Sequence, residues 1–580
     1  MKIKYDLLIR NGLCKLKKIK ILFAENRNIV LFQQKWKRYK MSQSAKYIVI
    51  TGGVLSGLGK GIATASVGHL LSSKLHVVPI KCDGYLNTDP GTMNPIEHGE
   101  VFVLDDGGEV DMDFGHYERF LGVIGKSDWN LTMGKVYWRI LEKERKGDFL
   151  GKTVQLIPHV TNEIKKHFKK IANREKPDIV LIEIGGTVGD MENELFIEAV
   201  RQLGQEVGQD NIVYIHLTYV PVPASLGEHK TKPTQQSVKL LNERGIFPDI
   251  IIARSPKPLT KKVKEKIALF CNIPPEAVIS GQDVKTVYEV PILYDAQNLT
   301  AIIHKKLKIY SPPKLARWQK LVDAILHPED EITIAVCGKY TDLHDSYASI
   351  IEALIHSGAH LKTRVKLKWI ETTKIEQGKI TVEKSLEDVH GVIVPGGFGL
   401  RGIEGKIDII KYCRENNIPF LGICYGMQLA VIEFARNVCG LSGAHTTEAE
   451  EESIDVKHPV ICLLPSQKGL KKKGGTMRLG GQDVHIKPKT LARKIYKSDV
   501  IRERFRHRYE VNPDYVEKLE SCGMRFSGFE PQENIMQILE LPEHPFFMAV
   551  QYHPELISKL EKPEPLFYNL VKSAIEKKNK

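Results

Sequence analysis

Short apolar runs rich in β-branched residues alternate with longer amphipathic segments along most of this chain, a pattern typical of buried strands between helices. In the first half, the runs predict strands at 47–51, 77–81, 178–184, 211–218 and 250–253. In the second half, they predict strands at 332–336, 365–370, 391–394, 419–423 and 547–551. Such alternation favours parallel sheets with helices on both faces. We therefore expect two α/β domains in tandem, the first built on a doubly wound parallel sheet.

The break between the two series lies at 309–331, where a double proline precedes a short amphipathic segment. This composition is typical of a linker, so we expect one domain over 46–308 and another over 332–575. Residues 1–45 lack the pattern, and we expect a disordered basic extension there. No apolar stretch is long enough for a membrane span, and nine scattered cysteines without metal-ligand spacing favour a reduced, cytoplasmic protein.

The positive charge of the chain is concentrated in the N-terminal extension. The whole sequence has a formal net charge of +14. Residues 1–40 hold twelve Lys and Arg against Asp6 and Glu25, a net charge of +10, and the other 540 residues carry only +4. The predicted domains therefore lack the charge excess of a nucleic-acid-binding protein, and we expect no nucleic-acid partner.

The first predicted strand leads into a glycine-rich segment, TGGVLSGLGKG at 51–61, after which a helix is predicted. Glycines let backbone amides approach a phosphate, a helix N-terminus favours anions, and Lys60 could reach the outer phosphates. The usual phosphate-binding pattern would need glycine at Val54 and a hydroxyl residue at Gly61. The segment therefore predicts a nucleotide site whose metal is held by carboxylates from elsewhere, and a glycine-rich structural turn is the alternative.

A cysteine in the second half stands where a predicted strand meets a predicted helix, in LGICYGMQLA at 421–430. Such a turn exposes the Cys424 sulfur beside helix amides, which favours a nucleophile. The glycine turn at 394–399 could donate amides to an oxyanion. Downstream, His553 and Glu555 are two residues apart in a predicted extended segment, where the carboxylate could orient the imidazole. Together these residues favour a Cys-His-Glu triad over a structural thiol.

These motifs occur in the order found in class I glutamine amidotransferases, and residues 46–575 as a whole resemble the CTP synthase family, the glutamine-dependent UTP amidoligases. Other stretches that carry the resemblance are EIGGTVGDMEN at 183–193, GEHKTKPTQ at 227–235, GGTMRLG at 474–480 and RHRYEVN at 506–512. The resemblance implies ATP-dependent amination of UTP to CTP, the last step of de novo CTP synthesis. The nitrogen would be ammonia released from L-glutamine and passed to the second site by a protected interior route.

In the second domain, the resemblance implies a thioester on Cys424, proton transfer by His553 and an imidazole held by Glu555. The residues that it assigns to glutamine are Gly397, Tyr425, Gly426, Met427, Gln428, Glu448 and Arg508. Among them, the amides of Gly397 and Tyr425 would form the oxyanion hole. Glu448 would bind the amino group of glutamine and Arg508 its carboxylate. Alone, Arg508 could equally belong to a surface ion pair.

In the first domain, the resemblance implies a 4-phosphorylated UTP intermediate that is formed with ATP. The residues that it assigns to ATP are Gly57, Leu58, Gly59, Lys60, Gly61, Ile62 and Asp113. Lys60 and Lys81 would neutralise charge on the transferred phosphate. Asp113 and Glu183 match the Mg²⁺ ligands of the family, and carboxylate oxygens suit this ion. From the residues alone, Asp111 and Asp113 could equally form an exposed acidic turn.

The resemblance also implies a shared site for UTP and for its product CTP, which would act as a feedback inhibitor. The residues that it assigns to this site are Ser56, Asp190, Met191, Glu192, Lys230, Thr231, Lys232, Pro233, Thr234, Gln235 and Lys266. Alone, the two lysines and two hydroxyls of 230–235 fit either a triphosphate site or a basic loop.

Activation by GTP through 400–405, assembly into homotetramers and assembly into filaments are further implications of the resemblance. Two other interpretations explain fewer residues. Another glutamine-dependent ATP ligase would make the 230–235 segment a coincidence. A catalytically inactive, filament-forming paralogue would not need the intact set of Cys424, His553, Glu555 and Lys60.

Overall fold

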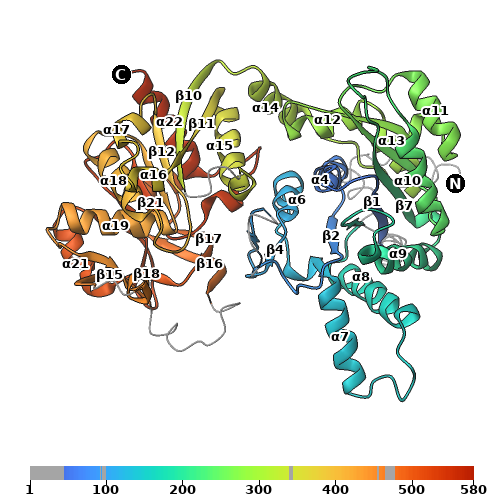
Figure 1. Cartoon of the computed structure of the whole chain (residues 1–580), viewed down its shortest axis with the longest axis horizontal. Helices are drawn as coiled ribbons and strands as arrows, with labels where there is room; N and C mark the ends of the chain where they lie inside the picture. The colour runs from blue at the N-terminus through green and yellow to red at the C-terminus, as the bar shows by residue number, and fades with distance from the viewer. Residues whose placement is uncertain (1–44, 92, 94–98, 339–343, 453–455, 464–476) are drawn as a thin grey trace, which may run out of the picture. The chain divides into compact units, whose positions relative to one another are not determined.

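The computed structural model of this chain describes residues 45–91, 93, 99–338, 344–452, 456–463 and 477–580 (Figure 1). Residues 47–580 form one compact unit. The disordered extension predicted for 1–45 falls almost entirely outside the described residues, so it stays a prediction. In the part of the chain that is described, no helix is both long enough and apolar enough to cross a bilayer.

The first half is built on a seven-stranded sheet with strand order β5-β2-β6-β1-β7-β8-β9. Strand β1 pairs in parallel with β7, β2 with β5 and β6, and β8 with β7 and β9. The strands are β1 (Lys46–Gly52), β2 (Val77–Asp83), β5 (Asn130–Thr132), β6 (Ile179–Ile184), β7 (Ile212–Tyr219), β8 (Ile250–Ser255) and β9 (Val278–Gln282). The five predicted strands are confirmed to within two residues, and the prediction missed β5 and β9.

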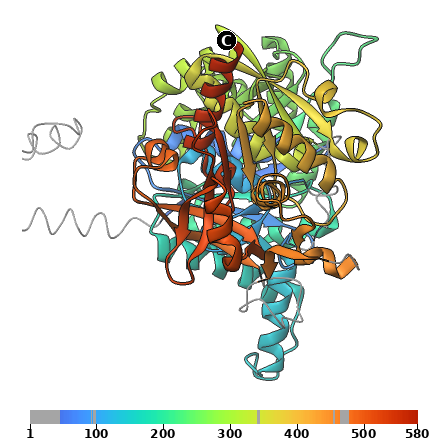
Figure 2. The same ribbon diagram turned by 90° about the vertical axis from the view of Figure 1, so that its left-hand side faces the viewer.

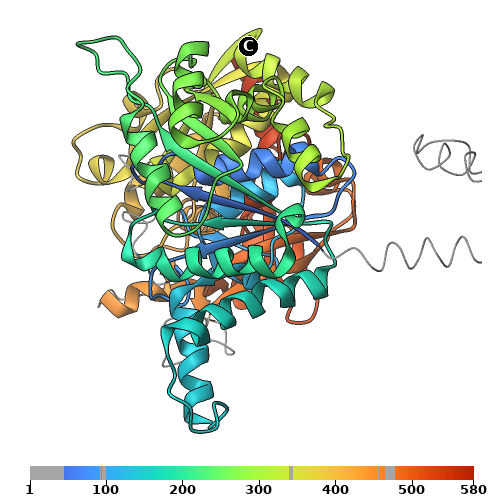
Figure 3. The same ribbon diagram turned by 90° about the vertical axis from the view of Figure 1, so that its right-hand side faces the viewer.

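Both faces of this sheet are buried, as a doubly wound fold requires. Along β8, Ile250 and Ile252 join one apolar core while Ile251 and Ala253 join another, because successive side chains point to opposite faces. Figure 3 shows helices above and below these blue and green strands. The helices of this half are α4 (Lys60–Leu71), α6 (Asp113–Leu121), α7 (Met133–Arg145), α8 (Thr161–Glu175), α9 (Glu194–Val207), α10 (Lys232–Glu243), α11 (Lys261–Cys271), α12 (Val290–Asp295) and α13 (Leu299–Leu307).

The predicted linker contains a helix of its own, α14 (Ala316–Leu326), and the next strand already begins at Asp330. Trp318 of α14 is fully buried and donates its indole N–H to the carbonyl oxygen of Tyr288 at 2.8 Å. The connection between the two halves is therefore packed against the protein rather than suspended in solvent.

The second half is built on a nine-stranded mixed sheet with strand order β11-β10-β12-β13-β21-β20-β19-β16-β17 (Figure 2). The first five strands run parallel, and β20, β19, β16 and β17 extend the sheet in antiparallel fashion. The strands are β10 (Asp330–Gly338), β11 (Thr363–Glu371), β12 (Gly391–Val394), β13 (Phe420–Ile423), β16 (Arg478–Ile486), β17 (Val500–His507), β19 (Arg525–Glu530), β20 (Ile535–Glu540) and β21 (Phe547–Val550).

The antiparallel extension was not predicted, although all five predicted parallel strands are confirmed. Two further small sheets were also missed, β14 (Ala444–Thr446) with β15 (His458–Leu463) and β18 (Tyr509–Val511), and β3 (Phe102–Val103) with β4 (Glu109–Val110). The helices of this half are α15 (Ala348–Leu361), α16 (Thr372–Glu376), α17 (Val382–Ser385), α18 (Ile403–Glu415), α19 (Tyr425–Asn437), α20 (Leu491–Tyr496), α21 (Pro513–Ser521) and α22 (Pro565–Lys578).

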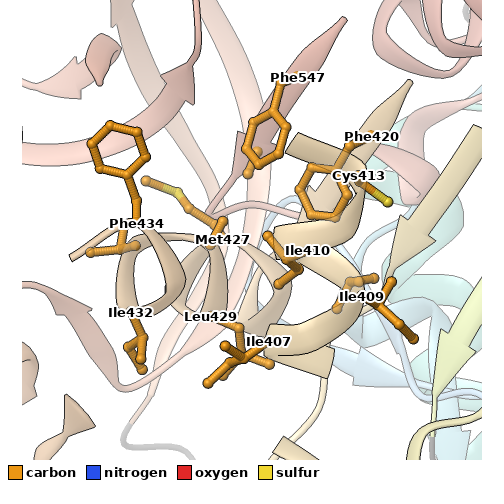
Figure 4. Close-up of a cluster of buried hydrophobic side chains, with 14 of the residues drawn as sticks. Ile407, Ile409, Ile410, Cys413, Phe420, Met427, Leu429, Ile432, Phe434 and Phe547 are labelled. Carbon is orange, nitrogen blue, oxygen red and sulfur yellow. The ribbon is translucent and has the colours of Figure 1, made fainter. Parts of the chain in front are cut away.

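The core beneath β13 and α19 fixes the turn between them. The rings of Phe420 and Phe547 stack at 4.5 Å between centroids, and Met427 and Ile410 belong to the same buried cluster (Figure 4). Because this cluster is closely packed, the residues that join β13 to α19 are held by apolar contacts on the inner side of the helix.

Candidate active sites

The turn that carries Cys424 joins β13 to α19, as predicted. Cys424 adopts φ 52° and ψ −101°, a strained conformation for a residue with a side chain, and such strain is characteristic of functional sites. Its amide donates to the carbonyl oxygen of Val550 at 2.7 Å, so the neighbouring strand holds the turn. The Cys424 thiol donates to the Arg506 carbonyl oxygen at 3.7 Å and accepts from Nε2 of Gln551 at 3.6 Å. The sulfur is therefore oriented by two polar neighbours.

His553 and Glu555 lie beside this turn. The Glu555 carboxylate accepts a hydrogen bond from Nδ1 of His553 at 2.7 Å. A Cβ placed on Gly396 would lie 3.7 Å from Nε2 of His553 and 3.6 Å from Cβ of Cys424, so imidazole and thiol line the same small space. The predicted extended segment is wrong, because Pro554 begins a 3₁₀ turn, η10 (Pro554–Ile557). The turn still brings the two side chains together.

The charge state of His553 follows from its neighbours. Burial opposes a charged imidazole, but the Glu555 carboxylate and the Cys424 thiolate outweigh burial and raise the pKa of His553 from 6.5 to about 10. This raised pKa adds stability that is fully present below pH 6.5 and is lost as the pH rises through about 10. At neutral pH the His553 imidazole is therefore positively charged where it faces Cys424.

We expect an NMR titration of the histidine-labelled protein to give His553 a pKa of about 10. In Glu555→Gln this pKa should fall by roughly one to two units, since a nearby carboxylate favours the imidazolium by that order. His390, which lies outside the site, serves as the internal control resonance. An unperturbed pKa for His553 in the wild type would contradict the assignment.

The loop after β12 faces the start of α19. Its Gly399 amide donates to Oε1 of Glu448 at 3.0 Å, and its Gly399 carbonyl accepts from the Tyr425 hydroxyl at 3.2 Å. A Cβ on Gly397 would lie 4.0 Å from the Tyr425 ring, so this side chain lies beside the glycine turn. Nζ of Lys406, a fully buried lysine, lies 5.4 Å from the centre of the same ring. The Tyr425 side chain thus ties the loop to the helix.

The other residues that were predicted to bind the substrate glutamine differ in their surroundings. Gly426, Met427 and Gln428 form the first turn of α19 and are buried. Met427 points into the core, so only its backbone faces the turn (Figure 4). Nε2 of Gln428 donates to Oε1 of Gln551 at 3.2 Å, which holds the residue that contacts the nucleophile. Arg508 is half-buried at the junction between β17 and β18.

The predicted nucleotide loop lies at the carboxyl end of β1. Gly57 and Gly59 adopt φ 74° and 83°, and apart from their chain neighbours no described residue has an atom within 4 Å of a Cβ placed on either, so the described structure leaves the loop open above them. Among the described residues, no side chain caps the N-terminus of α4, whose first residue is Lys60. Nζ of Lys60 donates to the Gly186 carbonyl oxygen at 2.7 Å, and burial lowers the pKa of this lysine. This geometry is that of an anion-binding loop and helix N-terminus.

Asp113 explains why the loop has glycine where a hydroxyl residue is usual. A Cβ on Gly61 would clash with the carboxylate of Asp113, which fills the space that a serine or threonine would occupy. Asp113 and Glu183 both bond to Nζ of Lys81, the latter at 3.0 Å, so their oxygens converge on one point. The Asp113 side chain is only 21% exposed and is paired with Lys81, so it does not belong to an exposed acidic turn.

More carboxylates surround Lys81 than its single positive charge can neutralise. Burial, with the neighbouring carboxylates, keeps the pKa values of Asp83, Asp111 and Asp113 above their ordinary values even beside this lysine. No group of three metal-ligating side chains occurs among the described residues. Two converging carboxylates in an acid-rich site fit Mg²⁺ when substrate phosphates supply the remaining oxygens, as is usual for this ion.

The predicted UTP and CTP residues lie on several segments at the carboxyl edge of the first sheet. Lys230 and Thr231 precede α10, and Lys232, Pro233, Thr234 and Gln235 form its first turn. A Cβ on Gly53 would clash with Ser237 of α10, so this helix packs on the nucleotide loop that carries exposed Ser56. The exposed loop of Asp190, Met191 and Glu192 is close to Gly84, after β2. Lys266 is exposed on α11, and its side chain makes no hydrogen bond or ion pair with a described residue.

Three contributing residues were missed by sequence reasoning. Asp83 accepts from the side-chain amide of Asn130 at 3.0 Å, and the Tyr117 hydroxyl donates to Oε2 of Glu183 at 2.6 Å. Gln551 contacts the nucleophile. Asp83 could have been found from the sequence, since it is two residues after Lys81 at the end of the same strand and therefore lies on the same face.

Comparison with known proteins gives one consistent result. Residues 46–309 match the family described as CTP synthase N-terminus, and residues 342–573 match the family described as glutamine amidotransferase class-I. A CTP synthase from Borreliella burgdorferi is 56% identical over 539 residues, which cover 92% of this chain and 100% of that protein. CTP synthases from Thermococcus gammatolerans and Archaeoglobus fulgidus are 52% and 51% identical, cover 92% of this chain, and are themselves covered to 99% and 98%.

Proposed function

Because the chain belongs to the CTP synthase family, we propose that Cys424, His553 and Glu555 release ammonia from glutamine and that Lys81 and Asp113 serve the site where UTP is aminated. The overall reaction is glutamine-dependent conversion of UTP to CTP by an ATP-consuming ligase. The assignment of residues to its steps is our proposal. The observation that carries it is the strained Cys424 turn facing an imidazole whose Nδ1 is held by Glu555 at 2.7 Å.

In the glutaminase half-reaction, the Cys424 thiolate attacks the amide carbon of glutamine. The oxyanion that forms would accept hydrogen bonds from the amides of Gly397 and Tyr425. The His553 imidazolium then gives its proton to the leaving nitrogen, so that ammonia departs and a thioester remains. Water, deprotonated by the now neutral imidazole, hydrolyses the thioester to glutamate. The Glu555 carboxylate keeps the ring oriented throughout.

In the synthetase half-reaction, ATP transfers its terminal phosphoryl group to oxygen-4 of UTP. Lys60 and Lys81 would offset the charge on the transferred group. Asp113 and Glu183 would hold Mg²⁺, which supplies further charge neutralisation when bound with ATP. Ammonia then attacks carbon-4, and inorganic phosphate leaves. Residues 230–235, at the N-terminus of α10, would bind the UTP triphosphate through their lysines and the helix end.

The family resemblance supports further proposals about regulation, assembly and location. These are activation by GTP through 400–405, feedback inhibition by CTP at the UTP site, a homotetramer able to form filaments, and a cytoplasmic location. We also propose that ammonia passes through the interior of the protein and that the two domains span 46–308 and 332–575.

The test of this function is a direct assay of CTP formation. Purified protein is mixed with UTP, ATP, Mg²⁺ and either glutamine or ammonium chloride, and absorbance is followed where CTP absorbs more than UTP. CTP should form from both nitrogen sources. If glutamine is hydrolysed but neither source gives CTP, the glutaminase assignment stands and the UTP assignment fails.

We expect Tyr425→Phe to lower kcat for glutamine hydrolysis by about three- to tenfold, since removing one hydrogen bond to the Gly399 carbonyl costs roughly 0.5–1.5 kcal/mol. The backbone amide of residue 425 remains, so the loss should stay far below that of a triad variant. Ammonia-dependent CTP formation is the internal control and should not change. A kcat equal to that of wild type would show that the hydroxyl does not hold the oxyanion loop.

A further inference from the structure

Strand β17 (Val500–His507) contacts two of the three predicted catalytic residues, His553 and Cys424, through its backbone. The carbonyl oxygen of Arg504 accepts from the backbone amide of His553 at 2.8 Å. The carbonyl oxygen of Arg506 accepts from the Cys424 thiol at 3.7 Å. A distortion of this strand would therefore disturb the positions of both the nucleophile and its proton donor.

The side chains of the same strand contact the first half of the chain. Arginines at every second position point to one side of β17, as the two-residue period of a strand requires. Each meets an acidic residue of the first half, in the ion pairs Arg502–Asp105 (2.9 Å), Arg504–Glu118 (2.8 Å) and Arg506–Glu109 (2.8 Å). Arg504 and Arg506 thus contact the catalytic residues through their backbone and the first half of the chain through their side chains.

The central pair is buried and tightly held. The side chains of Arg504 and Glu118 are 4% and 3% exposed, whereas that of Arg502 is 52% exposed. One Arg504 nitrogen donates to both Glu118 oxygens, and another donates to the Val103 carbonyl at 3.0 Å. The Phe102 ring lies 5.4 Å from the Arg504 guanidinium. Neither side chain can shift without losing several contacts at once.

Glu118 belongs to α6, the short helix that also begins with Asp113. At its first residue, α6 presents Asp113 to Lys81 in the predicted phosphate-transfer site. Five residues further, Glu118 accepts from the Gly125 amide at 2.7 Å and binds Arg504. A nine-residue helix therefore links the synthetase site to the strand that holds the glutaminase residues.

Stability alone does not account for such a pair. The cost of removing two charges from water offsets most of their attraction, so buried ion pairs are often replaceable by apolar side chains without loss of stability. They do, however, fix a geometry. We propose that Arg504 and Glu118 are positioning residues for glutamine hydrolysis, which act by holding the β17 carbonyls against His553 and Cys424. This inference rests on the proposed glutaminase function of those two residues.

The test compares Glu118→Gln and the double variant Arg504→Met/Glu118→Met with wild type. Glutamine hydrolysis, ammonia-dependent CTP formation and thermal unfolding are measured on the full chain. In both variants kcat for hydrolysis should fall by about tenfold to a hundredfold, since small displacements of reacting groups carry losses of that order. KM for glutamine and ammonia-dependent CTP formation should stay within about threefold, because the glutamine contacts and Asp113 are untouched.

The matched control is Asp105→Asn, which breaks the exposed Arg502 pair of the same strand and should change each rate by no more than about twofold. A parallel fall of glutamine- and ammonia-dependent activity with a lower unfolding temperature would assign the pair a purely structural role. An unchanged kcat for hydrolysis in the double variant would also overturn the proposal. If wild type hydrolyses glutamine but forms no CTP, the UTP assignment fails while this inference is still decided by the hydrolysis rates.

Discussion

Replacing Cys424 by alanine is expected to abolish glutamine-dependent CTP formation while ammonia-dependent formation continues. In the proposed mechanism the Cys424 thiolate forms the covalent bond to glutamine at the strained turn between β13 and α19, and alanine has no group that could do so. Loss of a nucleophile that works as part of a triad typically lowers kcat by about 10⁴-fold or more. Alanine preserves the turn, since the strain lies in the backbone. The rates follow from the absorbance change on CTP formation with each nitrogen source.

Cys413 supplies the matched control for this variant. It is a fully buried cysteine of α18 that packs in the apolar core, away from His553. Cys413→Ala should reduce stability but leave the ratio of glutamine- to ammonia-dependent rates unchanged. Residual glutamine-dependent CTP formation in Cys424→Ala near the wild-type level would refute the nucleophile assignment.

Replacing Asp113 by asparagine is expected to produce the opposite phenotype. The carboxylate lies against the nucleotide loop at Gly61 and is paired with Lys81, so its loss removes charge where phosphate, metal and lysine would meet. Ammonia- and glutamine-dependent CTP formation should both fall by about 10²- to 10³-fold, the usual effect of removing one electrostatic contact to a transition state. Glutamine hydrolysis should remain within about tenfold of wild type.

The magnesium dependence of this variant gives a second measurement. If Asp113 holds the ion, Asp113→Asn should need a higher Mg²⁺ concentration for half-maximal rate. Asp210→Asn, which removes an exposed partner of Lys308, is the control and should change the rate by at most about twofold. An unchanged Mg²⁺ requirement together with a normal rate would exclude Asp113 from the site.

The parallel cores of both halves could be predicted from the sequence because strands such as β6, β12 and β13 are almost continuous apolar runs. Local chemistry also predicted the Cys424 turn and the partnership of His553 with Glu555. The short strand β5 and the antiparallel strands were missed since their residues alternate or are few, and their pairing is decided by contacts distant in sequence.

The contacts of β17 show what a single sequence cannot reveal. The alternating arginines at 502, 504 and 506 indicate a strand with one charged face. Their partners, Asp105, Glu118 and Glu109, are almost 400 positions away, and nothing in the local pattern connects them. Likewise, Asp113 fills the space beside Gly61 only because α6 folds against α4.

In the proposed reaction, nitrogen released from glutamine in the second half of the chain passes directly to the first half, where it aminates UTP. This transfer is tested most directly with glutamine labelled with ¹⁵N in its amide, supplied with UTP, ATP, Mg²⁺ and an excess of unlabelled ammonium. Mass spectrometry then measures the ¹⁵N content of the CTP that forms. Direct transfer would give CTP enriched in ¹⁵N far above the dissolved ammonium pool, and this enrichment would disappear in Cys424→Ala. CTP that carries only the isotope ratio of the dissolved pool would contradict direct transfer between the two sites.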